Sequence, residues 1–504
     1  MSTDKVGGNS SLPSVLIKTK PEEFQSYLED TSNLKGSAHT LYAPSDSREV
    51  SSLLEELCAQ KTHCTVSAGR TGTTGGCVPF DGVALSLENL TGIGPVDTAR
   101  GLVRVQAGVT LAALEERLRQ QNYTLRAAPT ESLAYIGGAI ATGASGVRGF
   151  GYGSIRNYVS ALDVVLSDGT PFAVRRGEVR AVKRTFAFTR EGRVFSFSLP
   201  SYACPPVKTQ AGYYVRDDMD LIDLFIGSEG TLGIIVGAEL AVSVVPHAMF
   251  DGLIFFEDKL KALSFVRSIQ ERKRKGAPCP VALEFFDSFS LEFLRPDYSF
   301  IPSQARAALY FEQEVGEADN LEESLATWAN RIEDAGALFD SCIIAETQKE
   351  RERLFLFRHR LPQRINEFLR STHQRKAATD IAVPDHLFLS MYTFYQEIAR
   401  SSGIEYVNFG HIGQSHLHFN FLPRNQEQSI HAQELLRTLC AKAVAFGGTV
   451  SAEHGIGKIK KPYLSLMYDQ KEIKEMAALK RYFDPACILG LDNIFDKELL
   501  IEAE

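Results

Sequence analysis

Two different hydrophobic periods run through the first half of the chain. Apolar residues recur every three or four positions in residues 48–60, REVSSLLEELCAQ, and again in residues 110–122, TLAALEERLRQQN, which open with threonine, a frequent helix cap. We expect an amphipathic helix at each. Short β-branched runs predict strands beside them, CTVSA at 64–68, VALSL at 83–87 and LVRVQAG at 102–108.

The alternation continues into a hairpin pattern. Residues 159–174, VSALDVVLSDGTPFAV, alternate on both sides of an Asp-Gly pair, which favours a tight turn between two strands. Residues 175–193, RRGEVRAVKRTFAFTREGR, form a basic stretch. We interpret this stretch as a second, solvated hairpin, and a docking patch for an acidic partner is the alternative.

The pattern changes near residues 245–250. A strand, GLIFFED at 252–258, leads to an amphipathic helix at 260–276, and further strands follow at 281–287 and 307–314. This β-α-β-like order is typical of a second α+β domain.

The composition is that of an ordinary globular protein and excludes several classes. The 504 residues are 44% hydrophobic and 23% charged with a net charge of -8, whereas a general nucleic-acid binder would normally be basic. No apolar run reaches about 18 residues, so no membrane span is predicted. Residues 1–20 are polar and lack the apolar core of a signal peptide. We expect a disordered leader and a cytosolic protein, with peripheral attachment to a membrane as the alternative.

The eight cysteines give no sign of a metal cluster. None forms a C-x-x-C pair, so neither an iron–sulfur cluster nor a structural zinc site is indicated. A disulfide framework is not expected in a chain without a secretion signal. We interpret the cysteines as small buried hydrophobic residues.

Two segments carry more glycine than a strand-to-helix joint requires. They are SAGRTGTTGG at 67–76 and IGGAIATGASGVRGFGYG at 136–153. Glycines allow backbone N–H groups to approach an anion closely, which suits a pyrophosphate. Neither segment has the context of a Rossmann site or a P-loop, so a structural role and phosphate binding remain comparable alternatives on composition alone.

Three of the chain's eleven histidines lie within GHIGQSHLHFN, residues 410–420. His416, His418 and Asn420 share strand parity and therefore one face, and a tight turn at 413–415 would bring His411 back to it. The spacing alone does not distinguish metal ligands, catalytic bases and imidazoles without either role.

Six motifs, taken in order, are similar to those of a known family. They are LYAPSDSREVSSLL, AGRTGTTGG, VRVQAGVTLAALEERL, PTESLAYIGGAIATGASGVRGFGYG, IGSEGTLGII and SAEHGIGK. Over roughly residues 40–495 the chain resembles FAD-binding oxidoreductases of the vanillyl-alcohol oxidase (PCMH) type. The similar branch holds glycolate oxidase flavin subunits and D-lactate and D-2-hydroxyglutarate dehydrogenases.

The resemblance implies an α+β fold in three parts. These are a leader and first helix at 1–37, a two-part FAD-binding domain at 38–247, and a cap domain with an antiparallel sheet at 248–504. It also implies a set of cofactor-binding residues, with backbone amides of the first loop on the diphosphate: Gly69, Arg70, Thr71, Gly72, Thr73, Pro129, Gly137, Gly138, Thr142, Ser145, Gly146, Ile235 and Asn493. The first loop has no histidine for a covalent link, so non-covalent FAD is expected.

By the same resemblance His411, His418 and Glu453 hold a divalent metal, Zn²⁺ or Mn²⁺. The relatives carry Asp-Gly-Asn where this chain has Gln414-Ser415-His416, so His416 could be an additional ligand. Imidazoles without a metal are the alternative. Glu453 and His454 are neighbours and would diverge on any regular element.

The resemblance also implies a reaction, the oxidation of a D-2-hydroxy acid by hydride transfer to flavin N5. His454 is the implied base, Arg358 the anchor of the substrate carboxylate, and Asn420 a hydrogen-bonding residue. The hydroxyglutarate enzymes have a lysine where this chain has Ala378, with Lys376 displaced. A monocarboxylate such as lactate or glycolate is therefore favoured.

Several alternatives stay open. The electron acceptor would be a quinone, a cytochrome, an iron–sulfur subunit or oxygen, and a homodimer is one possible assembly. An ether-lipid synthase of the same fold would use flavin for transferase chemistry, although the absence of a histidine triplet and the presence of EHGIG count against it. A weakly catalytic flavoprotein subunit is the second alternative. The closing segment 483–495 lacks the family's proline and second glycine, which puts cofactor affinity near Asn493 in doubt.

Overall fold

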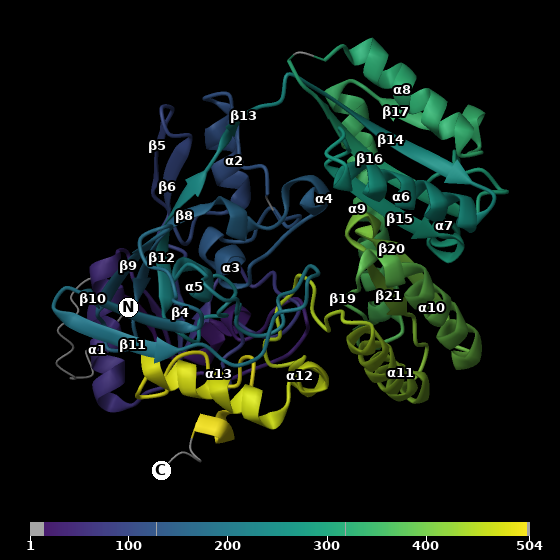
Figure 1. The fold of residues 1–504 in the computed structure, drawn as a ribbon. Helices are drawn as coiled ribbons and strands as arrows, with labels where there is room; N and C mark the ends of the chain where they lie inside the picture. Colours follow the sequence, from purple (N-terminus) through teal and green to yellow (C-terminus); the bar gives the residue numbers. More distant parts are fainter. Residues whose placement is uncertain (1–14, 128, 318, 501–504) are drawn as a thin grey trace, which may run out of the picture.

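The computed structural model of the protein describes residues 15–127, 129–317 and 319–500. Figure 1 shows two bodies, one built mainly from the purple and blue first half of the chain and one from the teal and green second half. The yellow C-terminal segment returns to the first body. Both bodies mix helices and sheets, so the expected α+β class is confirmed.

A small sheet opens the first body. Strands β2, β4 and β3 pair in parallel, and β1 joins β2 antiparallel. The strand bounds are Leu16–Lys18 (β1), Thr40–Ala43 (β2), Cys64–Ser67 (β3) and Val83–Ser86 (β4). Helix α1, Ser47–Gln60, is the helix expected at 48–60 and buries its apolar stripe against this sheet. The Asp46 carboxylate caps it by accepting from the N–H groups of Arg48 and Glu49.

A five-stranded antiparallel sheet forms the rest of the first body, in the order β5-β6-β12-β8-β9. The strands are Ile93–Asp97 (β5), Leu102–Gln106 (β6), Val159–Val165 (β8), Pro171–Arg175 (β9) and Ile234–Ala241 (β12). The predicted hairpin is the β8–β9 pair. Short helices and a two-stranded pair flank the sheet: α2 (Leu111–Arg119), β7 (Tyr123–Thr124), α3 (Ile136–Ala141), α4 (Gly149–Tyr152), α5 (Ile222–Phe225) and β13 (Ser243–Val244).

The basic stretch at 175–193 leads into a hairpin of β10, Thr185–Arg190, and β11, Arg193–Ser198. Five of its six arginines pair with carboxylates of the same chain: Arg175 with Glu239, Arg176 with Asp223, Arg184 with Asp217, Arg190 with Glu178 and Arg193 with Asp168. Internal pairing leaves little net positive charge for an acidic partner. The solvated-hairpin interpretation is therefore the better supported.

An eight-stranded antiparallel sheet is the centre of the second body. Its order is β17-β14-β16-β15-β20-β21-β18, and β19 also pairs with β21. The strands are Ala248–Phe256 (β14), Ala282–Asp287 (β15), Ala307–Val315 (β16), Ile343–Ala345 (β17), Ala377–Ala378 (β18), Ile381–Ala382 (β19), Tyr406–Gly410 (β20) and His416–Phe421 (β21). The helices are Lys259–Arg274 (α6), Ser288–Leu294 (α7), Leu321–Asp334 (α8), Gln348–Ser371 (α9), Phe388–Ser402 (α10) and Gln426–Ala445 (α11).

The chain then returns to the first body through α12, Lys461–Met467, and α13, Gln470–Phe483 (Figure 1). The buried Lys480 ammonium donates to Asp484, 2.7 Å away, and to the carbonyl of Thr231 at 3.1 Å. Leu489 bridges to Cys64 of β3. The division at residue 248 therefore does not separate two contiguous bodies, because residues near the C-terminus complete the first one.

Two smaller expectations need correction. Strand β1 begins at Leu16, so the end of the predicted leader is ordered in a sheet, while residues 1–14 lie outside the described residues. All eight cysteines are free, as expected without disulfides, but only Cys64 and Cys440 are fully buried. In the described parts of the chain, no helix is long and apolar enough to cross a membrane.

Candidate active site

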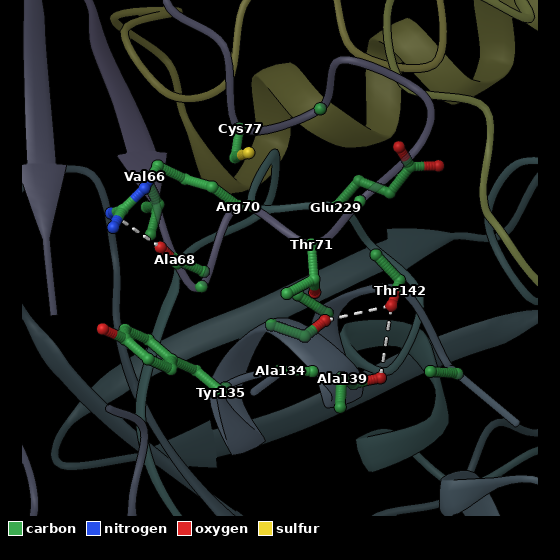
Figure 2. A pocket seen from close by; sticks show the side chains of 18 of the residues that line it. Val66, Ala68, Arg70, Thr71, Cys77, Ala134, Tyr135, Ala139, Thr142 and Glu229 are labelled. Atoms are coloured by element: carbon green, nitrogen blue, oxygen red, sulfur yellow. Dashed lines mark hydrogen bonds between the residues drawn. The ribbon is translucent and has the colours of Figure 1, made fainter. Parts of the chain in front are cut away.

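A cavity of about 350 Å³ lies between the two glycine-rich loops and the returning C-terminal segment (Figure 2). Twelve of the thirteen residues expected to bind the cofactor line it: Gly69, Arg70, Thr71, Gly72, Thr73, Pro129, Gly137, Gly138, Thr142, Ser145, Ile235 and Asn493. Gly146 is buried next to Ser145 and is not part of the wall. Glu453 and His454 stand at the same cavity.

Two of the glycines at this wall have no room for a side chain. A Cβ on Gly137 would lie 2.7 Å from the Ala107 side chain, and one on Gly69 would lie 2.9 Å from the Leu133 carbonyl. Arg70 adopts a left-handed φ of 58°, and its guanidinium stacks 4.3 Å from the Tyr27 ring centre. These contacts turn the first loop sharply and leave its backbone facing the cavity.

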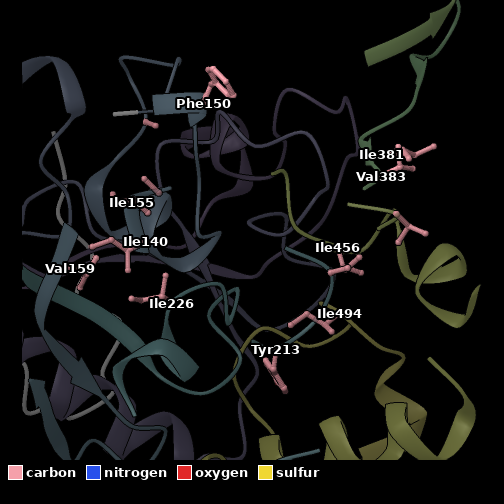
Figure 3. Packing of buried hydrophobic residues seen from close by; sticks show 14 of the residues in the cluster. Ile140, Phe150, Ile155, Val159, Tyr213, Ile226, Ile381, Val383, Ile456 and Ile494 are labelled. Atoms are coloured by element: carbon pink, nitrogen blue, oxygen red, sulfur yellow. The ribbon is translucent and has the colours of Figure 1, made fainter. Parts of the chain in front are cut away.

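Glu229 binds the SAEHGIGK segment and holds it beside the cavity. Its carboxylate accepts from the N–H groups of Ile456 at 2.7 Å and Gly457 at 2.6 Å. Burial raises the pKa of Glu229 to about 7. Behind this segment the Ile494 N–H donates to the Gly457 carbonyl at 3.0 Å, and Figure 3 shows Ile456 and Ile494 together in the core. The glutamate thus fixes the loop that carries Glu453 and His454.

Three histidines and a glutamate meet beside the cavity. The Nε2 atoms of His411 and His418 lie 3.2 and 3.3 Å from the same oxygen, Oε1 of Glu453. With His416, these residues offer four ligand atoms within 4.8 Å of one another. Burial lowers the pKa of His416 to about 3 and that of His418 to about 4, which favours the neutral imidazole form that binds metals. The turn through residues 413–415 returns His411 to the face of β21, as its spacing predicted.

A second ring of charges surrounds this cluster. The Glu284 carboxylate lies 2.5 Å from His411 Nδ1 and accepts from Arg358 Nε at 3.1 Å. Although burial would raise the pKa of Glu284, His411 and Arg358 lower it to about 2. The opposite Glu453 oxygen accepts from Lys208 Nζ at 2.5 Å. Arg358 is therefore linked to the cluster through a single residue, Glu284. Its role as an anchor of the substrate carboxylate stays a prediction.

Asp380 organises the other side of the site. Its Oδ2 atom lies 3.1 Å from His454 Nδ1 and accepts from Ser451 Oγ at 2.9 Å and Lys460 Nζ at 2.6 Å. Burial alone would raise the pKa of Asp380, but His454 and Lys460 hold it well below its usual range. Because a carboxylate only accepts, it keeps the proton on His454 Nδ1 and leaves Nε2 available.

Two predicted placements differ from the structure. Glu453 and His454 do not diverge, because they lie in a loop rather than a regular element, and His454 Nε2 is 3.5 Å from Glu453 Oε1. Asn420 is buried on β21, but its amide donates to the His418 carbonyl at 2.9 Å and it is not one of the cluster residues. A hydrogen bond from Asn420 to a substrate remains a prediction.

The cluster fits a divalent metal by two measures. Ligand atoms bound to one tetrahedral Zn²⁺ at about 2.0–2.2 Å lie roughly 3.3 Å apart, which matches the separations of His411 and His418 from Glu453. A carboxylate on the second ring nitrogen of His411 is the usual outer partner of a metal-bound histidine.

Comparison with known proteins decides the family. The FAD binding domain family matches residues 38–175, and the C-terminal domain family of FAD linked oxidases matches residues 247–491. The chain belongs to the FAD-linked oxidases. It is an FAD-dependent oxidoreductase of the branch that holds glycolate oxidase, D-lactate dehydrogenase and D-2-hydroxyglutarate dehydrogenase, so the resemblance found in the sequence is confirmed.

Curated relatives of this FAD-linked oxidase match over nearly their full length. Glycolate oxidase subunit GlcD of Bacillus subtilis is 28% identical over 466 residues, covering 90% of this chain and 88% of the relative. D-lactate dehydrogenase of Anaerostipes hadrus is 26% identical, covering 91% and 90%. D-2-hydroxyglutarate dehydrogenase of Xanthomonas citri pv. viticola is 28% identical, covering 96% and 95%.

Solved structures confirm the PCMH-type fold. An alkyldihydroxyacetonephosphate synthase matches with a TM-score of 0.66 at 17% identity, covering 94% of this chain and 82% of that one. The 4-ethylphenol oxidase from Gulosibacter chungangensis matches with a TM-score of 0.67 at 15% identity, covering 96% and 95%. At these identities the likeness concerns the fold alone.

Asn493 of this FAD-linked oxidase joins three parts of the cofactor cavity. Its amide donates to the carbonyls of Gly76 at 2.8 Å and Glu229 at 3.0 Å, and its oxygen accepts from Lys458 at 2.7 Å. Burial lowers the pKa of Lys458 to about 8. The neighbouring Ile494 holds a left-handed φ of 70°, which β-branched residues rarely adopt.

Replacing Asn493 with alanine is expected to weaken FAD binding by about 10- to 100-fold, because each polar group left unpaired in a buried site costs about 1–3 kcal/mol. Titration of the apoprotein with FAD, followed by the loss of flavin fluorescence, measures the change. Asn425→Ala is the control, because it removes a helix cap in the other body and should leave FAD affinity unchanged. Equal FAD affinity for the Asn493 variant and the wild type would refute this role.

Proposed function

We propose that this protein is an FAD-dependent dehydrogenase that oxidises a D-2-hydroxy monocarboxylate, such as D-lactate or glycolate, to the 2-oxo acid. The observation that carries the proposal is the position of His454. The residue lines the cavity that the glycine loops form, and its ring lies against Asp380 on one nitrogen and Glu453 on the other. An oriented imidazole beside a flavin cavity is suited to removing a hydroxyl proton.

Each residue of the site has one task in this reaction. His454 Nε2 receives the hydroxyl proton, and the Asp380 carboxylate stabilises the imidazolium that results. Arg358 would anchor the substrate carboxylate with the donors that Glu284 does not use. FAD bound in the cavity supplies the acceptor for the hydride that leaves the α-carbon. Its binding without a covalent link remains our expectation, since the first loop has no histidine.

His411, His418 and Glu453 would hold a divalent metal, Zn²⁺ or Mn²⁺. Two imidazoles and one carboxylate suit either ion and leave positions open for substrate oxygens. A metal there would orient the substrate carboxylate and lower the pKa of its hydroxyl. The electron acceptor that reoxidises the flavin would be a separate quinone, cytochrome, iron–sulfur subunit or oxygen.

Anaerobic bleaching of the flavin tests the proposal. Purified, metal-loaded protein is offered D-lactate, L-lactate, glycolate, D-2-hydroxyglutarate and a longer D-2-hydroxy acid in parallel. We expect a D-monocarboxylate or glycolate to bleach the flavin. Selective bleaching by D-2-hydroxyglutarate would correct the substrate class, and a yellow protein that none of them bleaches would favour a transferase or an assembly subunit.

Arg358→Lys is expected to raise the KM for the hydroxy acid by about tenfold, with a smaller change in kcat, because one ammonium cannot serve both Glu284 and a substrate carboxylate as a guanidinium can. Steady-state kinetics measure the change. Arg360→Lys is the control, since Arg360 pairs with Asp297 and Glu367 on the exposed side of the same helix. An unchanged KM in the Arg358 variant would place the anchor elsewhere.

Removal of metal is expected to slow flavin reduction by about tenfold or more without releasing FAD, because the metal activates the substrate and does not hold the cofactor. Treatment with a chelator followed by stopped-flow reduction measures the loss, and added Zn²⁺ or Mn²⁺ should restore the rate. Reduction that is indifferent to the chelator would remove the metal from the proposal.

A further inference from the structure

Lys208 reaches the proposed metal site from the opposite body of the molecule. It lies in the segment between β11 and α5, and its Nζ atom is 2.5 Å from Glu453 Oε2 and 3.3 Å from His416 Nδ1. Its side chain is only 7% exposed. The ammonium therefore contacts two of the four residues that could bind a metal.

The two residues that follow Lys208 bind to both the C-terminal loop and the second glycine-rich loop. The hydroxyl of Thr209 lies 2.8 Å from that of Thr449, and Gln210 donates from its backbone to the Ser451 carbonyl at 2.8 Å. The Gln210 amide also donates to the Gly143 carbonyl at 2.8 Å. These contacts fix the backbone next to Lys208, so the position of its side chain in the site is set by the fold.

The charges of the site are already balanced by side chains. Each of its three buried carboxylates already has a lysine or arginine partner: Glu284 pairs with Arg358, Glu453 with Lys208 and Asp380 with Lys460. A divalent cation would add two charges that no side chain of this network compensates. In a buried site such an excess is costly, because little water screens it.

We propose that Lys208 is an internal cation that competes with a divalent metal for Glu453 and His416, and thereby lowers the metal affinity of the site. The inference rests on the metal site of the proposed function and not on its substrate. Lys208 also orients Glu453 by one hydrogen bond, but His411, His418 and Ser145 contact the same carboxylate. Loss of the repulsion should therefore outweigh loss of that one contact.

Titration of the FAD-loaded, metal-free protein with Zn²⁺ against a chromophoric chelator tests the proposal without any substrate. Lys208→Met, which keeps the length of the side chain and removes its charge, is expected to bind Zn²⁺ at least about tenfold more tightly. Lys471→Met is the charge-matched control, since Lys471 is 77% exposed and distant from the donors. Equal or weaker Zn²⁺ binding by the Lys208 variant, or equal tightening in the control, would overturn the proposal.

Two further variants keep the result interpretable. Lys208→Gln retains a hydrogen-bond donor without the charge, so it should also tighten Zn²⁺ binding and serves if the methionine variant does not fold. His416→Asn in the Lys208→Met background should weaken Zn²⁺ binding again, because it removes the imidazole that Lys208 covers. An affinity unaffected by His416→Asn would remove His416 from the competition and refute that part of the proposal. Failure of the flavin-bleaching assay would not alter any of these affinities.

Discussion

Replacing His454 with alanine is expected to leave FAD bound while slowing flavin reduction by about a hundredfold or more, the usual contribution of a positioned general base. His454 lines the cofactor cavity, and its contact with the first glycine loop is made by its backbone carbonyl, which accepts from the Thr74 hydroxyl at 3.3 Å. Its loss therefore removes the proton acceptor and preserves the cavity. Anaerobic stopped-flow reduction by the best substrate measures the rate.

His431→Ala is the matched control, because His431 is an exposed histidine on α11 whose nearest charge is Glu434. That variant should reduce its flavin at the wild-type rate. A His454 variant that also did so would exclude this residue as the base. A His454 variant that lost FAD would instead assign the residue to the architecture of the cavity.

Replacing Asp380 with alanine is expected to destabilise the protein by about 3–5 kcal/mol, the typical result of removing one partner from a buried ion pair. The Asp380 carboxylate receives Lys460 Nζ at 2.6 Å, Ser451 Oγ at 2.9 Å and the His454 N–H at 3.1 Å. Alanine leaves the Lys460 ammonium without its carboxylate and the His454 N–H without its acceptor, whereas Ser451 Oγ keeps the Gly455 carbonyl at 2.6 Å. The midpoint of urea unfolding, followed by flavin fluorescence, measures the loss.

Asp496→Ala provides the comparison, because Asp496 pairs with Lys461 but is 65% exposed, and a surface ion pair contributes at most about 1 kcal/mol. Asp380→Asn separates stability from chemistry. It preserves the shape but can present an amide to His454, so we expect slower flavin reduction with a smaller loss of stability. An alanine variant as stable as the Asp496 variant would show that the Asp380 network contributes little.

Elements with a strong local pattern could be predicted from the sequence. The helical period and the capping residues marked α1 and α2 to within a few residues, and the Asp-Gly turn marked the β8–β9 hairpin. The position of β12 between β6 and β8 has no such signal, because pairing of distant strands depends on the whole fold. The return of residues 461–500 to the first body has no local signal either, and only the family resemblance, through Asn493, placed this segment at the cofactor.

The candidate site could likewise be predicted from the sequence only in part. Glycine-rich loops and closely spaced histidines are visible in a sequence because their residue types are unusual. Lys208 and Glu284 are not, since one is a single lysine in an irregular segment and the other lies in a mostly apolar strand. Glu229 lies in a motif that was noted, but its contact with the Glu453 loop depends on a chain separation of more than 220 residues. Only the folded chain brings these charges together.

The hydrogen bond from Asn493 to Gly76 spans 417 residues of sequence, and this fixes the order of events during synthesis. At about 5–20 residues per second, a ribosome needs roughly 20–80 s to reach Asn493 after making Gly76. Throughout that interval the cavity of the nascent first domain lacks Glu453, His454 and Asn493, which complete its wall. The complete cavity, and with it the full set of contacts that would hold FAD, therefore exists only after residue 493 has been made.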